Sequence, residues 1–518
     1  MRSGGGAGIK MQPAGREGSG GQTNPLREAR EQLEHAEMLR RQGKFERAES
    51  ICSNLLRKYP DYFGALHTLG LIHADRGNYR RAVAPLVEAV MLNPRSWITY
   101  TALAGVYLRL DAKEMAAQAL EQARAIKPNE ASILVTLGEV YREEREYELA
   151  RDVLEQAVAA EPDLEAAIVG LASVYGTLGE NRKAVDTLNA LFARRSPSLG
   201  ALISLLSLPK QFIERDVLQD LAKLGPADGL NEEENKTILA FVKAAALDKA
   251  GRYSEAWQQA VAANQIVLPN IKDQLAAQIR EREIRLAWLK ELSPANAGIN
   301  DEKLPVSLFI LGSSRSGKTT LEQLAARLEG VKCGHENPSV ENAISRTFQE
   351  AGLLTTHWLG YLPPQFYPGV RELYADELAR RGAISAKVFT NTHPVYITNA
   401  AHIAAIIPNA RFIFIKRNAD DLTLRIFMKQ YERGNPYAYD VDTIRAHIEW
   451  YNQMIDLLAQ KFPKISRVIN YEDMVGDPLA TLRTAAELCG AAISNEALPP
   501  IGDDRDCAKP YREFLTAR

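Results

Sequence analysis

A loop rich in glycine and serine is the first stretch of this sequence whose residue types could do chemistry. Residues 312–319, GSSRSGKT, fit the pattern G-x-x-x-x-G-K-[ST] and lie between an apolar run, VSLFIL, and a stretch with helical spacing, TLEQLAARLEG. In a strand–loop–helix unit, successive backbone N–H groups and the helix N-terminus form a cradle for an anion. The sequence therefore predicts a phosphate-binding loop that ends in Gly317, Lys318 and Thr319.

A second group of cations follows a later strand-like run. The run Arg411–Ile415 ends in Lys416 and Arg417, and the next stretch, DDLTLRIFMKQY, has helical spacing. Arg425 and Lys429 lie four residues apart in that stretch and would share one helix face. Positive charge at the end of a buried strand suits a phosphate and has the wrong sign for a metal site. We predict that Arg417, Arg425 and Lys429 converge on a second anion.

The phosphate loop alone leaves the class of reaction open. A nucleotide triphosphatase also needs a carboxylate at a strand end to hold magnesium. Glu472 or Asp473, after the strand-like run Arg467–Asn470, could play that part, but no acidic residue directly closes an apolar run of four. An ATP- or GTP-dependent phosphotransferase or hydrolase, and a catalytically inactive repeat scaffold, therefore stay open as alternatives.

The first half of the chain repeats every 34 residues. A proline that ends each unit, and small residues where two helix backbones meet, are typical of tetratricopeptide repeats. The positions that keep the period are Pro60, Pro94, Pro128 and Pro162; Ala48, Ala82, Ala116, Ala150 and Ala184; and Gly70, Ala104, Gly138 and Ala172. We expect near five units over residues 31–197 and a weaker copy at Lys243–Asn264. Such arrays stack into solenoids that bind peptides or act as spacers.

Composition limits the other function classes. The chain has 518 residues, 46% of them apolar, and a formal net charge of −2, which argues against general polyanion or nucleic-acid binding. Its four cysteines have no C-x-x-C spacing, so we expect neither a zinc site nor a disulfide framework. The absence of a disulfide framework predicts a cytoplasmic location. Residues 1–25 are Gly-rich without an apolar core, which predicts a disordered tail and no secretory signal. No apolar run is long enough to span a membrane.

Over residues 305–490 the sequence resembles the bacterial tetratricopeptide-repeat sulfotransferases and, more distantly, the tyrosylprotein sulfotransferases. SSRSGKTTLEQL resembles their P-R-S-G-T-T-L-x-E-Q-I loop, and VKCGHE resembles V-R-C-G-E-E. PNARFIFIKRNADDLTL resembles P-x-A-x-x-I-x-x-x-R-D-P-x-D, and NYEDMVGDP resembles the Y-E-D-L-V segment. The implied fold is an all-α tetratricopeptide-repeat solenoid followed by an α/β P-loop-like sulfotransferase domain with a mostly parallel sheet. The expected domains are a tail (1–25), repeats (26–197), further helical repeats or linker (198–300) and the sulfotransferase domain (301–518).

The resemblance implies the donor 3′-phosphoadenosine 5′-phosphosulfate (PAPS), the product 3′-phosphoadenosine 5′-phosphate (PAP) and no metal. The residues that would hold the 5′ end of the donor are Arg315, Ser316, Gly317, Lys318, Thr319 and Thr320. Those that would hold its 3′-phosphate are Arg417, Arg425 and Lys429, and Tyr471 occupies a donor-contacting position. Glu336 would be the catalytic base with His335 as the alternative, and Lys318 would stabilise charge on the bridging oxygen.

This sequence departs from the family pattern at several positions. Lys318 and Arg425 stand where the family usually has Thr and Ser, and Thr392 stands where it has Lys. The family's donor-closing segment after Cys489–Gly490 is absent or replaced. The acceptor is a hydroxyl, and a tyrosine in a peptide or protein, a carbohydrate and a small molecule all stay open, as does a homodimer.

Overall fold

The computed structural model describes residues 25–110, 112–224, 232–293, 300–353, 358–431, 434–499 and 501–516. The chain divides into two compact units, and the division falls between Ile133 and Leu134. Most of the predicted disordered tail, residues 1–24, lies outside the described residues. No described helix combines the length and the apolar character that crossing a membrane requires.

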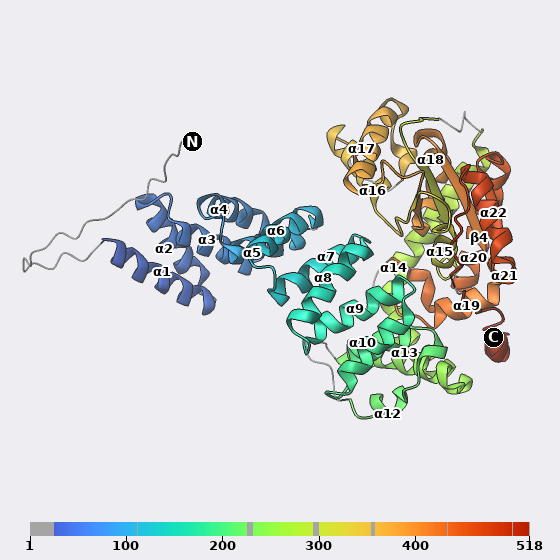
Figure 1. The fold of residues 1–518 in the computed structure, drawn as a ribbon, viewed down its shortest axis with the longest axis horizontal. Coiled ribbons are helices and arrows are strands. Elements are labelled where there is room, and N and C mark those ends of the chain that lie inside the picture. The colour runs from blue at the N-terminus through green and yellow to red at the C-terminus, as the bar shows by residue number, and fades with distance from the viewer. Residues whose placement is uncertain are drawn as a thin grey trace, which may run out of the picture. The chain divides into compact units, whose positions relative to one another are not determined.

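The N-terminal unit consists of paired helices joined by tight turns (Figure 1). The 34-residue period has a physical cause in these pairs: a Cβ at Gly70 would lie 2.5 Å from the Leu86 side chain, and Ala82 is fully buried beside it. Only small residues let the two backbones approach this closely. The helix bounds are α1 Pro25–Arg41, α2 Phe45–Lys58, α3 Phe63–Asp75, α4 Tyr79–Leu92, α5 Trp97–Arg109 and α6 Lys113–Ile126, and α7 Ala131–Glu143 spans the division.

The second unit begins with more helix pairs of the same kind. Gly138 meets Leu154 as Gly70 meets Leu86, with a virtual Cβ 2.6 Å from the leucine side chain. The helices are α8 Tyr147–Ala160, α9 Glu165–Thr177, α10 Asn181–Phe192, α11 Leu199–Ser207, α12 Val217–Leu221, α13 Glu232–Ala250 and α14 Tyr253–Glu291, with a 3-10 turn η1 Lys210–Phe212. The predicted weaker repeat copy corresponds to the α13–α14 pair.

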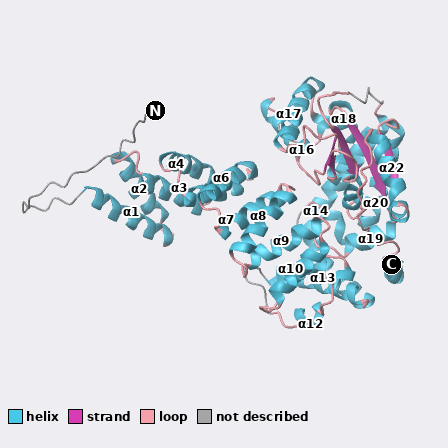
Figure 2. Cartoon of the chain, viewed as in Figure 1, coloured by secondary structure: helices cyan, strands magenta, loops and turns pink. Residues whose placement is uncertain are grey.

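A five-stranded sheet follows, and all of its strands are parallel. The spatial order is β2-β3-β1-β4-β5, so β1 lies at the centre between β3 and β4. In Figure 2 the strands are confined to this part of the chain, with helices around them. The strands are β1 Val306–Leu311, β2 Val331–Lys332, β3 Val388–Asn391, β4 Ala410–Lys416 and β5 Ser466–Asn470. Strands β1, β4 and β5 confirm the three predicted runs, whereas β2 and β3 were not predicted.

Alternate residues of the central strands pack on opposite faces of the sheet, as a parallel sheet covered on both sides requires. Phe309 and Phe412 lie in the core with α16, α17, α18 and α20, whereas Ile310 and Ile413 pack against α15, α21 and α22. The remaining helices are α15 Lys318–Ala325, α16 Ser339–Glu350, α17 Tyr367–Arg380, α18 Ala400–Ile406, α19 Ala419–Phe427, α20 Val441–Lys461, α21 Tyr471–Gly476, α22 Pro478–Cys489 and α23 Arg512–Thr516; the 3-10 turns are η2 Leu359–Tyr361, η3 Pro364–Phe366, η4 Pro394–Thr398, η5 Pro436–Tyr439 and η6 Lys509–Tyr511.

The later repeat helices and the sheet domain share apolar cores within the second unit. Phe241 and Ala260, from α13 and α14, are buried with Leu422 and Ile426 of α19. All helices after Leu134 therefore belong to the same compact unit as the sheet. The domain boundaries at residues 197 and 300 stay predictions.

Candidate functional site

The phosphate-binding loop lies at the carboxyl end of β1, which leads into α15 on one face of the sheet, whereas its neighbour β3 leads into α18 on the other face. Ligands of open α/β sheets bind at such a position. A Cβ at Gly312 would lie 2.8 Å from the Ile415 carbonyl oxygen, and one at Gly317 would lie 2.5 Å from the Tyr471 ring. Gly317 also has a φ of +102°, in the left-handed region that favours glycine. Both glycines are therefore required for the loop to sit against β4 and α21.

The loop offers several groups to an anion. The hydroxyls of Ser313 and Ser316 are buried without a protein partner, and α15 starts directly after the loop at Lys318. The Lys318 Nζ donates to the Ser313 carbonyl oxygen at 3.1 Å, and burial lowers the pKa of this lysine. Thr319 and Thr320, in the first turn of α15, are exposed and half-buried. Unpartnered hydroxyls and a helix N-terminus fit an anionic group such as a phosphate or a sulfate.

Arg417 connects the loop to the second group of cations. Its side chain is 4% exposed, and its Nη1 donates to the Arg315 carbonyl oxygen at 3.1 Å. The guanidinium lies 4.1 Å from the centroid of the Tyr471 ring, which itself packs on Gly317. Arg417 Nε is buried without a protein partner. Arg417 and the phosphate-binding loop therefore lie side by side.

A carboxylate from the C-terminal segment lies between the two predicted phosphate-binding arginines. Arg425 donates from Nε to Asp504 Oδ2 at 2.9 Å and from Nη2 to Oδ1. Arg417 Nη2 donates to the Asp504 carbonyl oxygen at 2.6 Å and contacts Oδ2 at 3.2 Å. Burial alone would raise the pKa of Asp504, but the hydrogen bonds and charges of Arg425 and Arg417 outweigh burial and hold that pKa below its ordinary value.

The C-terminal segment is held firmly in this position. The backbone N–H groups of Asp506 and Ala508 donate to the two carboxylate oxygens of buried Asp421, at 2.9 and 2.8 Å. The Tyr511 hydroxyl donates to Asp248 on α13 at 2.7 Å. Residues 501–516 are thus fixed beside Arg417 and Arg425. Nothing in the sequence pattern signalled that Asp504 would meet Arg425.

One prediction about the second cation group was wrong. Helix α19 ends at Phe427, so Lys429 does not share a helix face with Arg425. The Lys429 ammonium lies 5.1 Å from the centroid of the Tyr431 ring, and the Tyr431 hydroxyl bonds to Ser314 of the loop at 2.9 Å. The charges that act on Lys429 come from Arg315, Glu336 and Lys318. Lys429 therefore lies on the side of the phosphate loop.

The candidate base, Glu336, follows β2 and lies near the loop. Its carboxylate acts electrostatically on the pKa of Lys318 and of Lys429, and its side chain is 38% exposed. Arg145 Nη2, from the turn between α7 and α8, lies 3.6 Å from Glu336 Oε2. Glu336 thus pairs with a repeat residue that the sequence did not single out, and its charge acts on Lys318 and Lys429.

His335 has a different environment from its neighbour. Its Nδ1 lies 2.8 Å from the Oε2 of buried Glu322, and its ring meets Tyr147 edge-on with centroids 4.9 Å apart. Burial alone would lower the pKa of His335, but the charge and hydrogen bond of Glu322 hold it above the ordinary value. The ring therefore links α15 to the repeat helix α8, which favours Glu336 over His335 as the base.

The carboxylates that could have imitated a magnesium site have structural partners. Glu472 accepts a hydrogen bond from the backbone N–H of Asn418 at 2.9 Å, and Asp473 accepts one from Asn470 Nδ2 at 2.8 Å. Within the described ranges, no three His, Cys, Asp or Glu side chains gather as a metal ion would require. The cysteines Cys52, Cys333, Cys489 and Cys507 are all free thiols.

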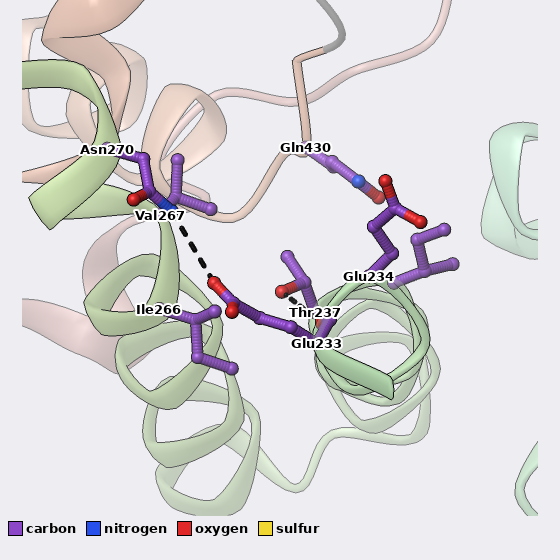
Figure 3. Close-up of a pocket in the computed structure, with 8 residues that line it drawn as sticks. Glu233, Glu234, Thr237, Ile266, Val267, Asn270 and Gln430 are labelled. Carbon is purple, nitrogen blue, oxygen red and sulfur yellow. Dashed lines mark hydrogen bonds between the residues drawn. The ribbon is translucent and has the colours of Figure 1, made fainter. Parts of the chain in front are cut away.

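A separate hollow of about 540 Å³ lies between α13, α14 and the residue Gln430 (Figure 3). Asn270 Nδ2 donates to Glu233 Oε1 across it at 3.4 Å. The lining residues are Glu233, Glu234, Thr237, Ile238, Ile266, Val267, Asn270 and Gln430. None of them is a predicted site residue, so this hollow is distinct from the anion site.

Comparisons with known proteins find separate matches for the two parts of the chain. Residues 305–495 match the model of the sulfotransferase family, and residues 131–164 match a tetratricopeptide-repeat model. A solved structure of MamA is similar at 25% identity, over 30% of this chain and 92% of that chain, with a TM-score of 0.30. PilF of Pseudomonas aeruginosa is similar at 17% identity, over 38% of this chain and 90% of that chain, with a TM-score of 0.34. No curated protein matches the sequence.

The two family matches fall on separate parts of the structure. The sulfotransferase match begins at the residue before β1 and extends past α22, so it includes the phosphate loop, Glu336, Arg417 and Arg425. The repeat match coincides with α7 and α8, the pair whose turn meets Glu336. The chain therefore joins tetratricopeptide repeats to a domain that matches the sulfotransferase family model.

Proposed function

We propose that this chain transfers a sulfuryl group from PAPS to a hydroxyl acceptor. The observation that carries the proposal is the position of Arg417, whose guanidinium donates to the backbone of the phosphate loop at 3.1 Å. PAPS bears anions on both the 5′ and the 3′ side of one ribose. A site that sets a loop cradle beside buried arginines suits such a nucleotide, and the family match points to the same chemistry.

Donor binding would divide between the two groups of residues. The 5′ phosphosulfate would lie on the loop, against Arg315, Ser316 and Gly317, and on the first turn of α15, formed by Lys318, Thr319 and Thr320. The 3′-phosphate would take the hydrogen bonds that Arg417 and Arg425 now give to Asp504. Tyr471 would support the donor indirectly, because its ring holds the Arg417 guanidinium from one side.

The donor supplies an activated sulfuryl group on a phosphate, and the protein supplies position and charge. Transfer of this kind proceeds by in-line displacement, so most of the catalysis is orientation and electrostatic stabilisation. Lys318 would release the Ser313 carbonyl and stabilise negative charge on the bridging phosphate oxygen. Glu336 would take the proton from the acceptor hydroxyl.

We propose a tyrosine in a peptide or protein as the acceptor, bound with the help of the repeats. Two repeat residues of the α7–α8 turn reach the site, Arg145 at Glu336 and Tyr147 at His335. An acceptor that approaches Glu336 would therefore meet the repeat array as well. Solenoids of this kind commonly hold extended peptides.

The test is a transfer assay with donor labelled on sulfur. The full chain is incubated with tyrosine peptides, oligosaccharides and phenols in separate reactions, and both labelled acceptor and PAP are measured. We expect label on tyrosine peptides and loss of transfer in Lys318→Ala. Label on the other acceptors alone would overturn the acceptor assignment. ATP hydrolysis with magnesium and no sulfuryl transfer would replace the proposal by the triphosphatase alternative, and absence of PAP binding would favour the inactive scaffold.

A further inference from the structure

The turn between α7 and α8 contains an arginine at a position of the 34-residue register that is glycine in three other repeats and aspartate, Asp111, in the preceding one. Gly43, Gly77 and Gly179 occupy this turn position in other repeats and have φ values of +72°, +76° and +81°. Arg145 lies in the same 34-residue register and has a φ of +63°. A residue with a Cβ is strained in this left-handed region. Strain of this kind is retained where the side chain has a use, so the position points to a function for the guanidinium.

The Arg145 side chain is directed at the candidate base. Its Nη1 donates to the Tyr147 hydroxyl at 2.8 Å, and its Nη2 lies 3.6 Å from Glu336 Oε2. Its charge also acts on Lys429 and His393, on both of which the charge of Lys318 acts as well. The repeat turn thus adds a cation to the same group of charges that includes Glu336.

The turn is fixed to the sheet domain on both sides of Arg145. Arg381, whose side chain is 9% exposed, donates to the Glu144 carbonyl oxygen at 3.2 Å and to Glu146 Oε1 at 2.9 Å. On the other side, Tyr147 packs its ring edge against His335. Buried, multiply bonded contacts of this kind define one geometry for the turn.

The backbone of Glu336 is fixed as well. The N–H of His335 donates to Glu322 Oε1 at 2.9 Å, and the His335 carbonyl accepts from the Thr392 N–H at 2.8 Å. The next residue, Asn337, is buried and accepts from Asn391 Nδ2 through its carbonyl oxygen at 2.9 Å. What remains to be fixed is the carboxylate, and its ion pair among the described residues is with Arg145.

We propose that Arg145 is a positioning residue of the transferase site: it holds the Glu336 carboxylate toward the acceptor hydroxyl, so that one repeat is a working part of the active site. The inference rests on the proposed function, because it takes Glu336 as the base. It goes beyond that function by assigning the α7–α8 repeat a role in the chemical step and not only in acceptor binding.

The decisive variant is Arg145→Gly, because glycine suits the left-handed turn while removing the cation. We expect the unfolding temperature to hold or rise, PAP affinity and the KM for donor to stay unchanged, and kcat to fall on the order of tenfold to a hundredfold. Arg145→Lys should recover part of the lost kcat. If Arg145 had only a structural role, Arg145→Gly would lower the unfolding temperature and kcat together. An unchanged kcat in a stable Arg145→Gly protein would overturn the proposal.

Gly43→Arg is the matched control, since it places the same residue in the same turn of another repeat. It should lower the unfolding temperature and leave kcat unchanged. A second measurement does not depend on transfer: the effect of Arg145→Gly on unfolding temperature is compared in wild-type and Glu336→Gln backgrounds. The increase in unfolding temperature caused by Arg145→Gly should be larger in the Glu336→Gln background, because the substitution removes no ion pair there. Equal gains would refute the contact, whereas an inactive wild type with unequal gains would keep the contact and refute the proposed function together with the role that Arg145 takes from it.

Discussion

Replacing Asp504 with alanine should strengthen the binding of PAP. In the structure the Asp504 carboxylate accepts two hydrogen bonds from Arg425 and lies 3.2 Å from Arg417 Nη2, so a 3′-phosphate must displace it. The backbone carbonyl of Asp504 would still accept from Arg417 at 2.6 Å, so the variant removes the competing anion and leaves the segment attached. Asp421 and Tyr511 hold the rest of the segment and are untouched.

The size of the effect follows from the number and exposure of these bonds. A hydrogen bond to a charged group contributes about 1.5–3 kcal/mol when it is well shielded. Arg425 and Asp504 have side chains that are 33% and 36% exposed, so solvent screening reduces the value of the pair. A net gain of about 1–2 kcal/mol is reasonable, which corresponds to a PAP dissociation constant roughly 5- to 30-fold lower.

Calorimetric titration of PAP into the wild type, Asp504→Ala and Asp504→Asn measures this gain directly. Asp503→Asn is the matched control, because Asp503 is the neighbouring carboxylate and pairs with Arg505 instead. The control should bind PAP as the wild type does. Weaker PAP binding by Asp504→Ala, or tighter wild-type binding of a nucleotide that lacks the 3′-phosphate, would show that Asp504 recognises a ribose hydroxyl and would refute the reasoning.

Three further predictions concern the loop and its neighbours. In the transfer assay Lys318→Ala should lose most turnover, whereas Lys318→Thr, the family's usual residue, should retain more; wild-type turnover in Lys318→Ala would contradict the role of the ammonium. Gly317→Ala should cost about 1–3 kcal/mol of unfolding free energy and weaken PAP binding, because its Cβ would lie 2.5 Å from Tyr471; denaturant titration checks this. Since Glu322 raises the pKa of His335, the pair stabilises fully below about pH 6.5 and its contribution is lost as pH rises through the folded-state pKa. The unfolding free energy of the wild type should therefore fall relative to that of His335→Asn as the pH rises. If the two proteins lose stability in parallel with pH, the pair does not contribute.

The parts of the fold with local signals were predictable from the sequence. Apolar runs of several residues identified β1, β4 and β5, and the 34-residue period identified the repeats, because both patterns report burial directly. Strand β2 has two residues and β3 has four, of which Thr390 and Asn391 are polar, so neither forms a recognisable apolar run. The short length of β2 and the polar residues of β3 therefore made these strands unrecognisable in the sequence.

The site was predictable only where one local motif carries it. The phosphate loop and Arg417 follow strands directly, so their positions were predictable from the strands. Lys429 was assigned to a helix face that ends two residues earlier, at Phe427. Asp504 meets Arg425 across 79 residues of sequence, and no local pattern encodes such a contact. Arg145 did carry a signal, because three other repeats have glycine at its position in the 34-residue register.

The division between Ile133 and Leu134 has a consequence for engineering this protein. Repeats on the first side could be exchanged for those of another solenoid to redirect the enzyme, with its chemistry left intact. An exchange that includes α7 and α8 would also remove Arg145 and the Arg381 anchor, and would therefore need those residues grafted into the new scaffold.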